Sequence, residues 1–343
     1  MKLSSNKEKK TEQEKVDERR EEVLAQGRKF KYPLQWTKHR IVVSTILIAT
    51  IVIALVITSG WLALYRFNMT DDMLFRITKI IPISVATVDN EPVRFSDYLM
   101  FYRSSITSIE RQSGGLMDTS EGSIEDLRAQ YKRAALTEAE QYTYALKLAK
   151  ENNITVSDEE VKNEFERHLH IGGIERSEES FIKIIEDNFG LSKSEYERML
   201  YLTIIKAKVE EKIDTKAAET ATKVEQMLKE NGGNYTAVAE ALGEEISYEE
   251  TGGFVSAQNI DGGRASEAIK LEPGKESGKF VSINGDGYYF VKLVDKNETE
   301  VNFVSIKVPF TEFKNRFEKL EEENKITEFV DLTLPTTDNI QEQ

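Results

Sequence analysis

The sequence predicts an α+β protein with a single transmembrane helix near its N-terminus. Three observations predict this class. Residues 41–65 form a stretch of 25 residues without a charged side chain. Residues 84–213 contain several long segments with the apolar spacing of amphipathic helices. Residues 214–310 begin with helical spacing and continue with Gly-rich turns between short runs of β-branched and aromatic residues, which is typical of a small antiparallel sheet.

The uncharged stretch at residues 41–65 is long enough to cross a bilayer. A helix of this length reaches roughly 37 Å, against a hydrocarbon core of about 30 Å. A cleaved signal peptide is the competing interpretation, but its apolar core would have about 7–15 residues and would lead to small residues at a cleavage site. Here the apolar run continues into Trp61, Leu62 and Tyr65. We therefore expect an uncleaved membrane anchor.

The distribution of charge predicts the orientation of this anchor. Residues 1–40 carry a net charge of +5 and read as a solvated charged tail, whereas the chain after Tyr65 carries −19. Basic residues next to a membrane helix favour the cytoplasmic side. We expect a single-pass protein of the cell membrane with residues 1–40 in the cytoplasm and residues 66–343 outside it. Trp36 and Trp61 stand near the two ends of the span, where interfacial aromatic residues are common.

Composition excludes several kinds of chemistry. The 343 residues include no Cys, which removes disulfides, thiolate metal sites and cysteine nucleophiles. The net charge of −14 argues against nucleic acid as a partner. His168 and His170 lie two residues apart in a predicted helical turn, so they should point to different faces and make a poor metal site. We expect no metal and no other cofactor.

The region after a juxtamembrane linker (residues 66–83) is predicted to be mainly helical. Residues 83–95 read as a strand, a turn at Asp89-Asn90 and a second strand, followed by a helix from Ser96. Two later helices begin with capping-box patterns, at 157–160 and 192–195. These segments form one predicted domain, residues 84–213.

The second predicted domain, residues 214–310, starts with two helices and ends in strands. A Gly-Gly pair at 232–233 closes the first of these helices, and Asn284 to Gly287 form a hairpin turn signal. Strands are expected at 288–294 and at 301–308. Residues 311–343 are predicted to be a C-terminal helix, about 311–323, and a tail that is disordered after Pro335.

Several spaced segments of the first domain resemble the SurA N-terminal chaperone domain. They occur in the order expected for that family: VATVDNEPVRFSDYLMFY, ALKLAKENNITVSDEEVKNEF and LSKSEYERMLYLTIIKAKVEEKI. Residues 214–294 resemble a parvulin-type (PpiC-like) peptidyl-prolyl isomerase domain, through KAAETATKVEQMLKENGGNYTAVAEAL, TGGFV and SEAIKLEPGKESGKFVSINGDGYYFVKLVDK. An N-terminal anchor followed by these two modules resembles the layout of PpiD-type and PrsA-type extracytoplasmic foldases.

The parvulin-like segment departs from its family at the positions that matter for catalysis. The family has a histidine on its first and last strands, but the last strand here carries Tyr289, and the first strand is missing from its usual place. The strand at 301–308 could fold back beside the last one, giving a circularly permuted sheet with Ser305 as the nearest polar equivalent. Tyr289 and Ser305 are thus the catalytic candidates. The favoured alternative is that Tyr289 packs within the sheet and Ser305 faces solvent.

Four apolar residues are candidates for binding a substrate: Phe254, Ile260, Tyr288 and Phe290. An aromatic residue after a Gly turn, such as Phe254, more often belongs to a core. Three functions stay open at this point. The leading one is a membrane-anchored chaperone of unfolded or newly exported polypeptides, near the secretion machinery, with a weak or inactive isomerase domain. The others are an active prolyl isomerase with substituted pocket residues and a non-catalytic envelope scaffold.

Overall fold

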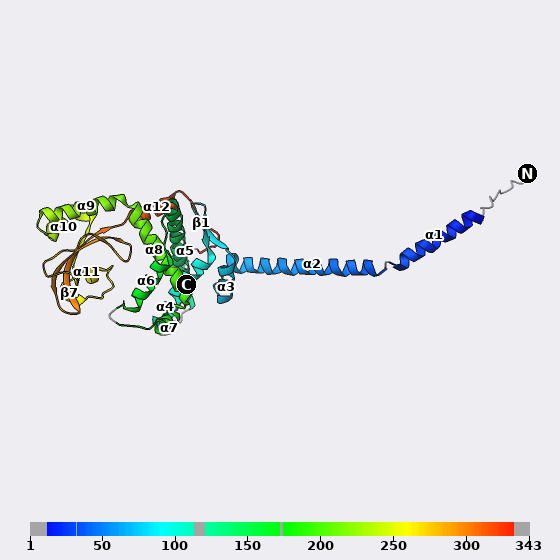
Figure 1. Ribbon diagram of the computed structural model, residues 1–343, viewed down its shortest axis with the longest axis horizontal. Coiled ribbons are helices and arrows are strands. Elements are labelled where there is room, and N and C mark those ends of the chain that lie inside the picture. Colours follow the sequence, from blue (N-terminus) through cyan, green and yellow to red (C-terminus); the bar gives the residue numbers. More distant parts are fainter. Residues whose placement is uncertain (1–11, 32, 113–120, 172–173, 333–343) are drawn as a thin grey trace, which may run out of the picture. The chain divides into compact units, whose positions relative to one another are not determined.

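The computed structural model describes residues 12–31, 33–112, 121–171 and 174–332. The chain divides into two units, Met1–Ala63 and Leu64–Gln343 (Figure 1). The first unit holds α1 (Glu12–Lys31) and α2 (Pro33–Trp61). The charged segment of residues 12–31 is helical and exposed where its side chains are described. The side chain of Trp36 and the tail predicted after Pro335 lie outside what the structure describes.

One helical stretch, His39–Arg66, is long and apolar enough to span a membrane, with 28 residues and a mean hydropathy of 2.9. It comprises most of α2 and the π-helical turn η1 (Leu62–Arg66). The hydroxyl groups of Thr45, Thr50 and Thr58 each donate to the carbonyl four residues earlier, at 2.8–2.9 Å. These polar side chains therefore need no partner outside the helix, as a lipid environment requires.

The second unit opens with a hairpin. Strands β1 (Ser84–Val88) and β2 (Glu91–Arg94) are antiparallel, and Asp89 and Asn90 make the turn with φ values of 47° and 70°. The predicted strand–turn–strand pattern is confirmed. A strand from the far end of the chain, β8 (Ile326–Glu328), pairs antiparallel with the other edge of β1 and gives the order β2-β1-β8.

Seven helices surround this small sheet in the described part of the unit: α3 (Asp72–Ile80), α4 (Phe95–Gln112), α5 (Glu121–Glu151), α6 (Asp158–Leu169), α7 (Glu178–Phe189), α8 (Lys193–Ile213) and α12 (Glu312–Glu322). Both predicted capping boxes are present. The backbone N–H of Ser157 donates to Glu160 at 2.9 Å, and that of Ser192 donates to Glu195 at 2.8 Å. The segment expected to be a linker contains α3.

The C-terminal helix completes the core of this helical region. Phe313, Phe317 and Leu320 of α12 are buried in the same apolar cluster as residues 64–213. Phe313 and Phe317 pack on Tyr144 of α5, with ring centroids 5.5 and 6.1 Å apart. We name residues 64–213 together with 311–332 the helical subdomain, and the inserted residues 214–310 the sheet subdomain.

The sheet subdomain has an antiparallel sheet in the order β3-β7-β6-β5, and β4 also pairs with β7. Its elements are α9 (Thr215–Glu230), α10 (Tyr235–Leu242), η3 (Gly243–Glu245), β3 (Ser247–Glu250), β4 (Val255–Ser256), α11 (Arg264–Ala268), β5 (Phe280–Val281), β6 (Gly287–Lys296) and β7 (Glu300–Pro309). β7 folds back beside β6, with Tyr289 opposite Lys307 and Val291 opposite Ser305. This is the pairing that the sequence allowed.

Two apolar cores lie on opposite faces of this sheet because side chains alternate along each strand. Tyr288, Phe290 and Ile306 pack against α9 and α10. Val291, Leu293 and Phe303 pack against α11. Figure 1 shows α9 and α10 along one face of the strands, with α11 beyond the other.

Contacts at Asp214 and at Gly285 are among those that join the subdomains. Asp214, only 2% exposed, stands between α8 and α9, and its carboxylate accepts from the N–H of Ala217 at 2.9 Å and of Thr311 at 2.6 Å. It therefore caps α9 and also holds the start of α12. At the β5–β6 turn, a Cβ on Gly285 would lie 2.3 Å from the Cβ of Ala207 in α8, so the two backbones approach closely.

Candidate functional site

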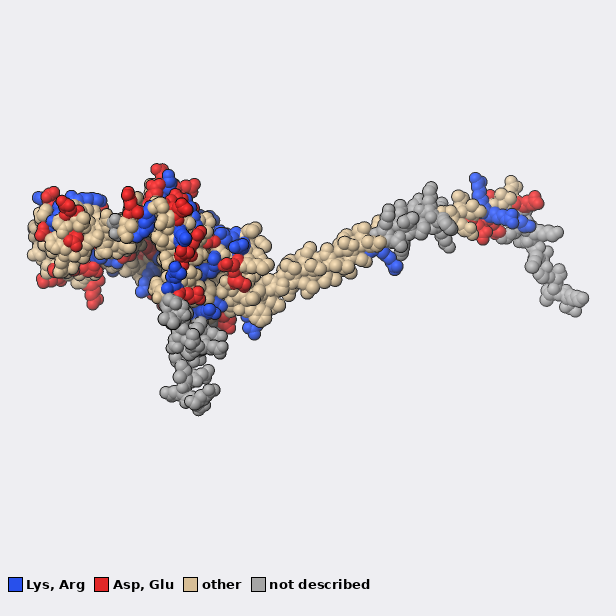
Figure 2. Space-filling view, turned by 90° about the horizontal axis from the view of Figure 1, so that it is seen from below, with Lys and Arg blue, Asp and Glu red and all other residues tan. Residues whose placement is uncertain are grey.

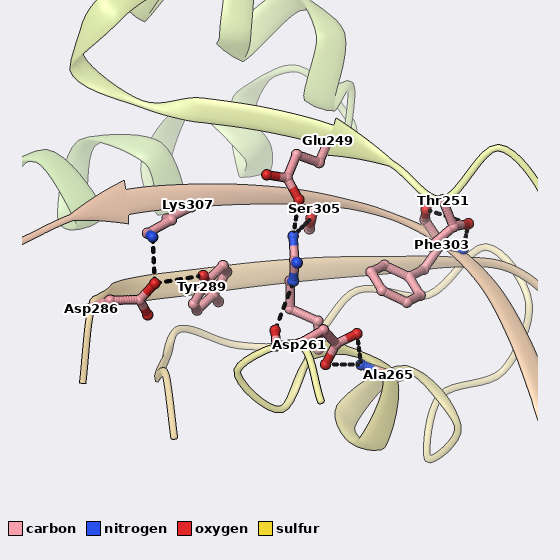
Figure 3. A network of polar contacts seen from close by, with 10 residues as sticks. Glu249, Thr251, Asp261, Ala265, Asp286, Tyr289, Phe303, Ser305 and Lys307 are labelled. Carbon is pink, nitrogen blue, oxygen red and sulfur yellow. Dashed lines mark hydrogen bonds and ion pairs between the residues drawn. The ribbon is translucent and has the colours of Figure 1, made fainter. Parts of the chain in front are cut away.

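Tyr289, the first catalytic candidate, is enclosed on the α11 face of the sheet (Figure 3). It is 4% exposed, and its hydroxyl donates to Asp286 at 3.3 Å. Lys307 forms an ion pair with the same carboxylate. Burial, and then the charge of Asp286, raise the pKa of Tyr289 above its ordinary value. Burial acts to raise the pKa of Asp286, but hydrogen bonding to Lys307 and Ser282 and the charge of Lys307 together outweigh it, and the pKa is lowered. The phenol thus stays neutral beside a charged pair.

Ser305, the second candidate, is 1% exposed and does not face solvent, so the expectation for this side chain is wrong. Arg264 of α11 donates to its hydroxyl at 3.3 Å, forms an ion pair with Glu249 and donates to the carbonyl of Asp261 at 2.9 Å. Figure 3 shows Glu249 and Ser305 on neighbouring strands, facing the α11 segment. The guanidinium group therefore covers the hydroxyl and ties α11 to β3.

This arrangement fills the space around the two catalytic candidates. The guanidinium carbon of Arg264 lies 5.3 Å from the ring centre of Tyr289, and Phe280 stacks on the same ring at 6.0 Å. A Cβ on Gly262 would lie 3.3 Å from that ring, so the loop at 261–263 also lies against it. A peptide can reach Tyr289 or Ser305 only if Arg264 and this loop move. The charges are paired, which suits a structural role better than proton transfer.

The four predicted substrate-binding residues do not gather at one place. Tyr288 and Phe290 are 6% and 1% exposed and belong to the core under α9 and α10, on the face opposite Tyr289. Phe254 is 48% exposed in the loop before β4, so the expectation that it joins a core is wrong. Ile260 is 70% exposed and lines a cavity described below.

A cavity of about 650 Å³ lies between the helical and sheet subdomains. Three helices and the β5–β6 turn enclose it. Apolar side chains form part of its lining, among them Met199, Leu200 and Ile204 of α8 and Val281 and Ile283 of the sheet subdomain. Polar and charged groups complete it: Glu138, Tyr142, Glu164, Arg167, His168, Thr203, Lys208, Glu211 and Asn284.

A second cavity, of about 320 Å³, continues from the first and shares Arg167, His168, Ile283 and Asn284 with it. Its other walls come from His170 and Ile171 and from residues 257–263 of the sheet subdomain. We name the two cavities together the inter-subdomain groove. His168 and His170, which were expected to point to different faces, both line this second cavity.

The charged groups of the groove are mostly paired. His168 lies 3.2 Å from Glu164 and 2.6 Å from the hydroxyl of Tyr196. Burial opposes ionisation of Glu164, but His168 and Arg167 together lower the pKa of its carboxyl to about 2. Burial raises the pKa of Glu138 above its ordinary value. Elsewhere acidic and basic side chains are interspersed over the surface that Figure 2 shows. The groove therefore offers apolar contacts and a few neutralised polar groups rather than a strong field of one sign.

The helical part of this fold agrees with the family comparison. Residues 34–210, more than half of the chain, match the SurA-like N-terminal domain. The chain belongs to this family, and the family indicates a chaperone-type function. The matched range includes the apolar helix as well as α3 to α8. A search of curated proteins finds no match.

Sequence reasoning did not identify the groove, although α8 carried a signal for it. Leu202, Ile205 and Val209 of this helix belong to the core, whereas Ile204 lines the groove and Met199 contacts both. A helix that is apolar around such a wide arc has to cover a second surface besides its own core. Arg264, Asp286 and Lys307 were also missed, because each is an ordinary surface residue type whose role depends on pairing within the folded sheet.

Proposed function

We propose that this chain is a membrane-anchored chaperone that holds unfolded polypeptides in the inter-subdomain groove. Its SurA-like family membership is the observation that carries the proposal. The groove supports it physically, because extended chain needs apolar contacts and room rather than one shaped pocket. The apolar lining at Ile204 and Ile283 meets this need, and the paired charges around it impose little sequence selectivity.

A matched pair of variants tests the groove. Ile283 is 41% exposed and lines both cavities, whereas Val294 is 51% exposed on β6 and lines neither. In an aggregation assay with a chemically unfolded test protein, the full chain in lipid nanodiscs should delay light scattering. Ile283→Asp should reduce this delay severalfold, and Val294→Asp should leave it unchanged. Equal behaviour of the two variants, or no delay by the parent protein, would remove the proposal.

The anchor and its orientation form part of the same proposal. The helix at residues 39–66 supports membrane attachment, and the excess of Lys and Arg before it supports a cytoplasmic N-terminus. Protease added to intact cells or spheroplasts should then digest residues 66–343 and spare residues 1–40. Digestion of the large part only after cell lysis would contradict this topology.

The sequence suggested a second candidate function for the sheet subdomain, prolyl isomerisation. Its antiparallel order β3-β7-β6-β5, with β7 beside β6, supports the permuted parvulin-like sheet that the sequence suggested. The closed surroundings of Tyr289 and Ser305 favour little or no activity, because catalysis needs a desolvated pocket open to the peptide. A proline-peptide isomerisation assay on the full chain should give the uncatalysed rate. A rate above it that Tyr289→Phe or Arg264→Ala changes would establish the enzyme instead.

A further inference from the structure

Large apolar side chains are concentrated on the surface of the second unit just after the predicted membrane span. Five of them, at 46–83% exposure, fall within 15 residues: Phe67, Met69, Met73, Ile80 and Ile81. The other described residues of this unit contribute only eight exposed large hydrophobic side chains in more than 200 residues. A concentration of this kind marks a surface that is covered by a partner.

The outward face of α3 carries two large apolar side chains among the charged groups Asp72, Arg76 and Lys79. Phe75 and Thr78 are 3% and 1% exposed and pack against the rest of the helical subdomain, so the inner face of α3 is already buried. Met73 and Ile80, seven residues apart and therefore on one face, are 72% and 83% exposed. Arg76 lies between them and is also exposed. Apolar residues beside a basic one on a helix face are typical of helices that lie in a membrane interface.

Ion pairs and a ring contact fix α3 to the rest of the helical subdomain. Arg103 of α4 lies 4.5 Å from the ring centre of Phe75 and 3.1 Å from the carboxylate of Asp72. Lys79 forms an ion pair with Glu195 of α8 at 3.0 Å. Any surface that binds the outer face of α3 therefore also sets the orientation of the subdomain.

We propose that α3, with residues 67–69 and 81, lies in the interfacial layer of the membrane and holds the helical subdomain against the lipid surface. This inference rests on the proposed membrane anchor. Met73 follows Arg66 by seven residues, and an extended chain of that length spans at most about 25 Å. These exposed apolar residues, which we name the patch, thus begin within about 25 Å of the end of the span. Arg66 and Arg76 are exposed and suit the anionic headgroups of such a layer.

The absence of Cys from the sequence allows a direct test in the full chain. Met73→Cys and Ile80→Cys would each be labelled with an environment-sensitive fluorophore and placed in vesicles of phosphatidylcholine and phosphatidylglycerol. Some of the lipids would carry a nitroxide quencher, near the headgroup for positions 73, 80 and 294 and deep in the acyl chain for position 48. Val294→Cys, at an exposed site on β6, is the matched control, and Ile48→Cys, within α2, reports the span itself. We expect quenching at positions 73 and 80 to exceed that at position 294 at least threefold.

A charge variant checks that the contact is made by the patch. Ile80→Asp should at least halve the quenching at position 73, whereas Val294→Asp should leave it unchanged. Quenching at position 48 together with none at 73 and 80 would overturn this inference and leave the anchor in place. The patch would then be available to a protein partner. An unquenched probe at position 48 would instead remove the anchor, and this inference with it.

Discussion

Asp214 provides the sharpest test of how the two subdomains are joined. The chain passes between the subdomains twice, at 213–215 and at 310–312, and this one buried carboxylate contacts both crossings. It accepts the N–H of Ala217 at 2.9 Å, of Thr311 at 2.6 Å and of Glu312 at 3.0 Å. Three backbone donors of two helices therefore depend on a single side chain.

Removal of this carboxylate should cost more than the loss of an ordinary helix cap. Replacement of one N-cap by Ala costs about 0.5–2 kcal/mol, so Asp214→Ala, which affects two helices, should lower the free energy of unfolding by about 1–4 kcal/mol. For a folded unit of this size, that corresponds to a fall in Tm of roughly 2–16 °C. Asp214→Asn retains one acceptor oxygen, so its free energy of unfolding should lie between those of Asp214→Ala and the parent protein.

Thermal unfolding of the full chain in detergent micelles, followed by circular dichroism, measures this effect. Asn234→Ala is the matched control, because Asn234 caps α10 alone through the N–H of Ala237 at 3.1 Å. Amide hydrogen exchange should also accelerate at both Ala217 and Thr311 in Asp214→Ala. The reasoning is refuted if Asp214→Ala is no more destabilising than Asn234→Ala, or if only one of the two amides responds.

Three further predictions concern other contacts. Gly285→Ala should destabilise the protein by at least about 1 kcal/mol more than Gly274→Ala, because both glycines have positive φ but only the first meets Ala207. Burial and neighbouring acidic groups raise the pKa of Glu140 to about 8, so the native state keeps a proton that the unfolded chain loses near pH 4.5. Stability should therefore fall as pH rises from about 5 to 8, and Glu140→Gln should abolish this slope. Phe317→Ala should cost about 3–5 kcal/mol, because its ring is 4% exposed.

Urea unfolding of the full chain would measure each of these changes. Equal effects of the two glycine variants would show that the turn and α8 do not touch in solution. An identical pH slope in Glu140→Gln and the parent would mean that this carboxyl is already charged at neutral pH. A loss below 1 kcal/mol for Phe317→Ala would show that α12 is not part of the helical core.

Local sequence signals predicted the local structure well. The hairpin at 84–94, both capping boxes and the helix after Thr311 follow from short patterns whose physical cause lies within a few residues. The pairing of β8 with β1 could not be predicted in this way. β8 has only three residues, and its partner stands more than 230 positions earlier. Nothing in the composition of residues 326–328 specifies that contact, which depends on where α12 places the chain.

In the candidate site, the sequence predicts which strand residues share a face, but it does not predict whether the pocket is open. Strand periodicity alone separates Tyr288 and Phe290 from Tyr289, because neighbouring residues of a strand face opposite ways. Those two should not have been grouped with Tyr289 as substrate contacts. The closure over Tyr289 was beyond the sequence, since it depends on Arg264 reaching across from α11 to Glu249. Whether a pocket is open depends on such tertiary pairing, and residue types do not reveal it.

The helix α12 and the strand β8 follow the sheet subdomain along the chain, although they complete the helical subdomain. As the polypeptide emerges, the sheet subdomain has all its strands once residue 309 is present, and it can assemble while residues 64–213 still lack β8 and α12. A product cut short before residue 311 would leave one edge of β1 bare and the ring of Tyr144 without its two phenylalanine neighbours. The core of the helical subdomain therefore depends on residues that lie beyond the sheet subdomain in the sequence.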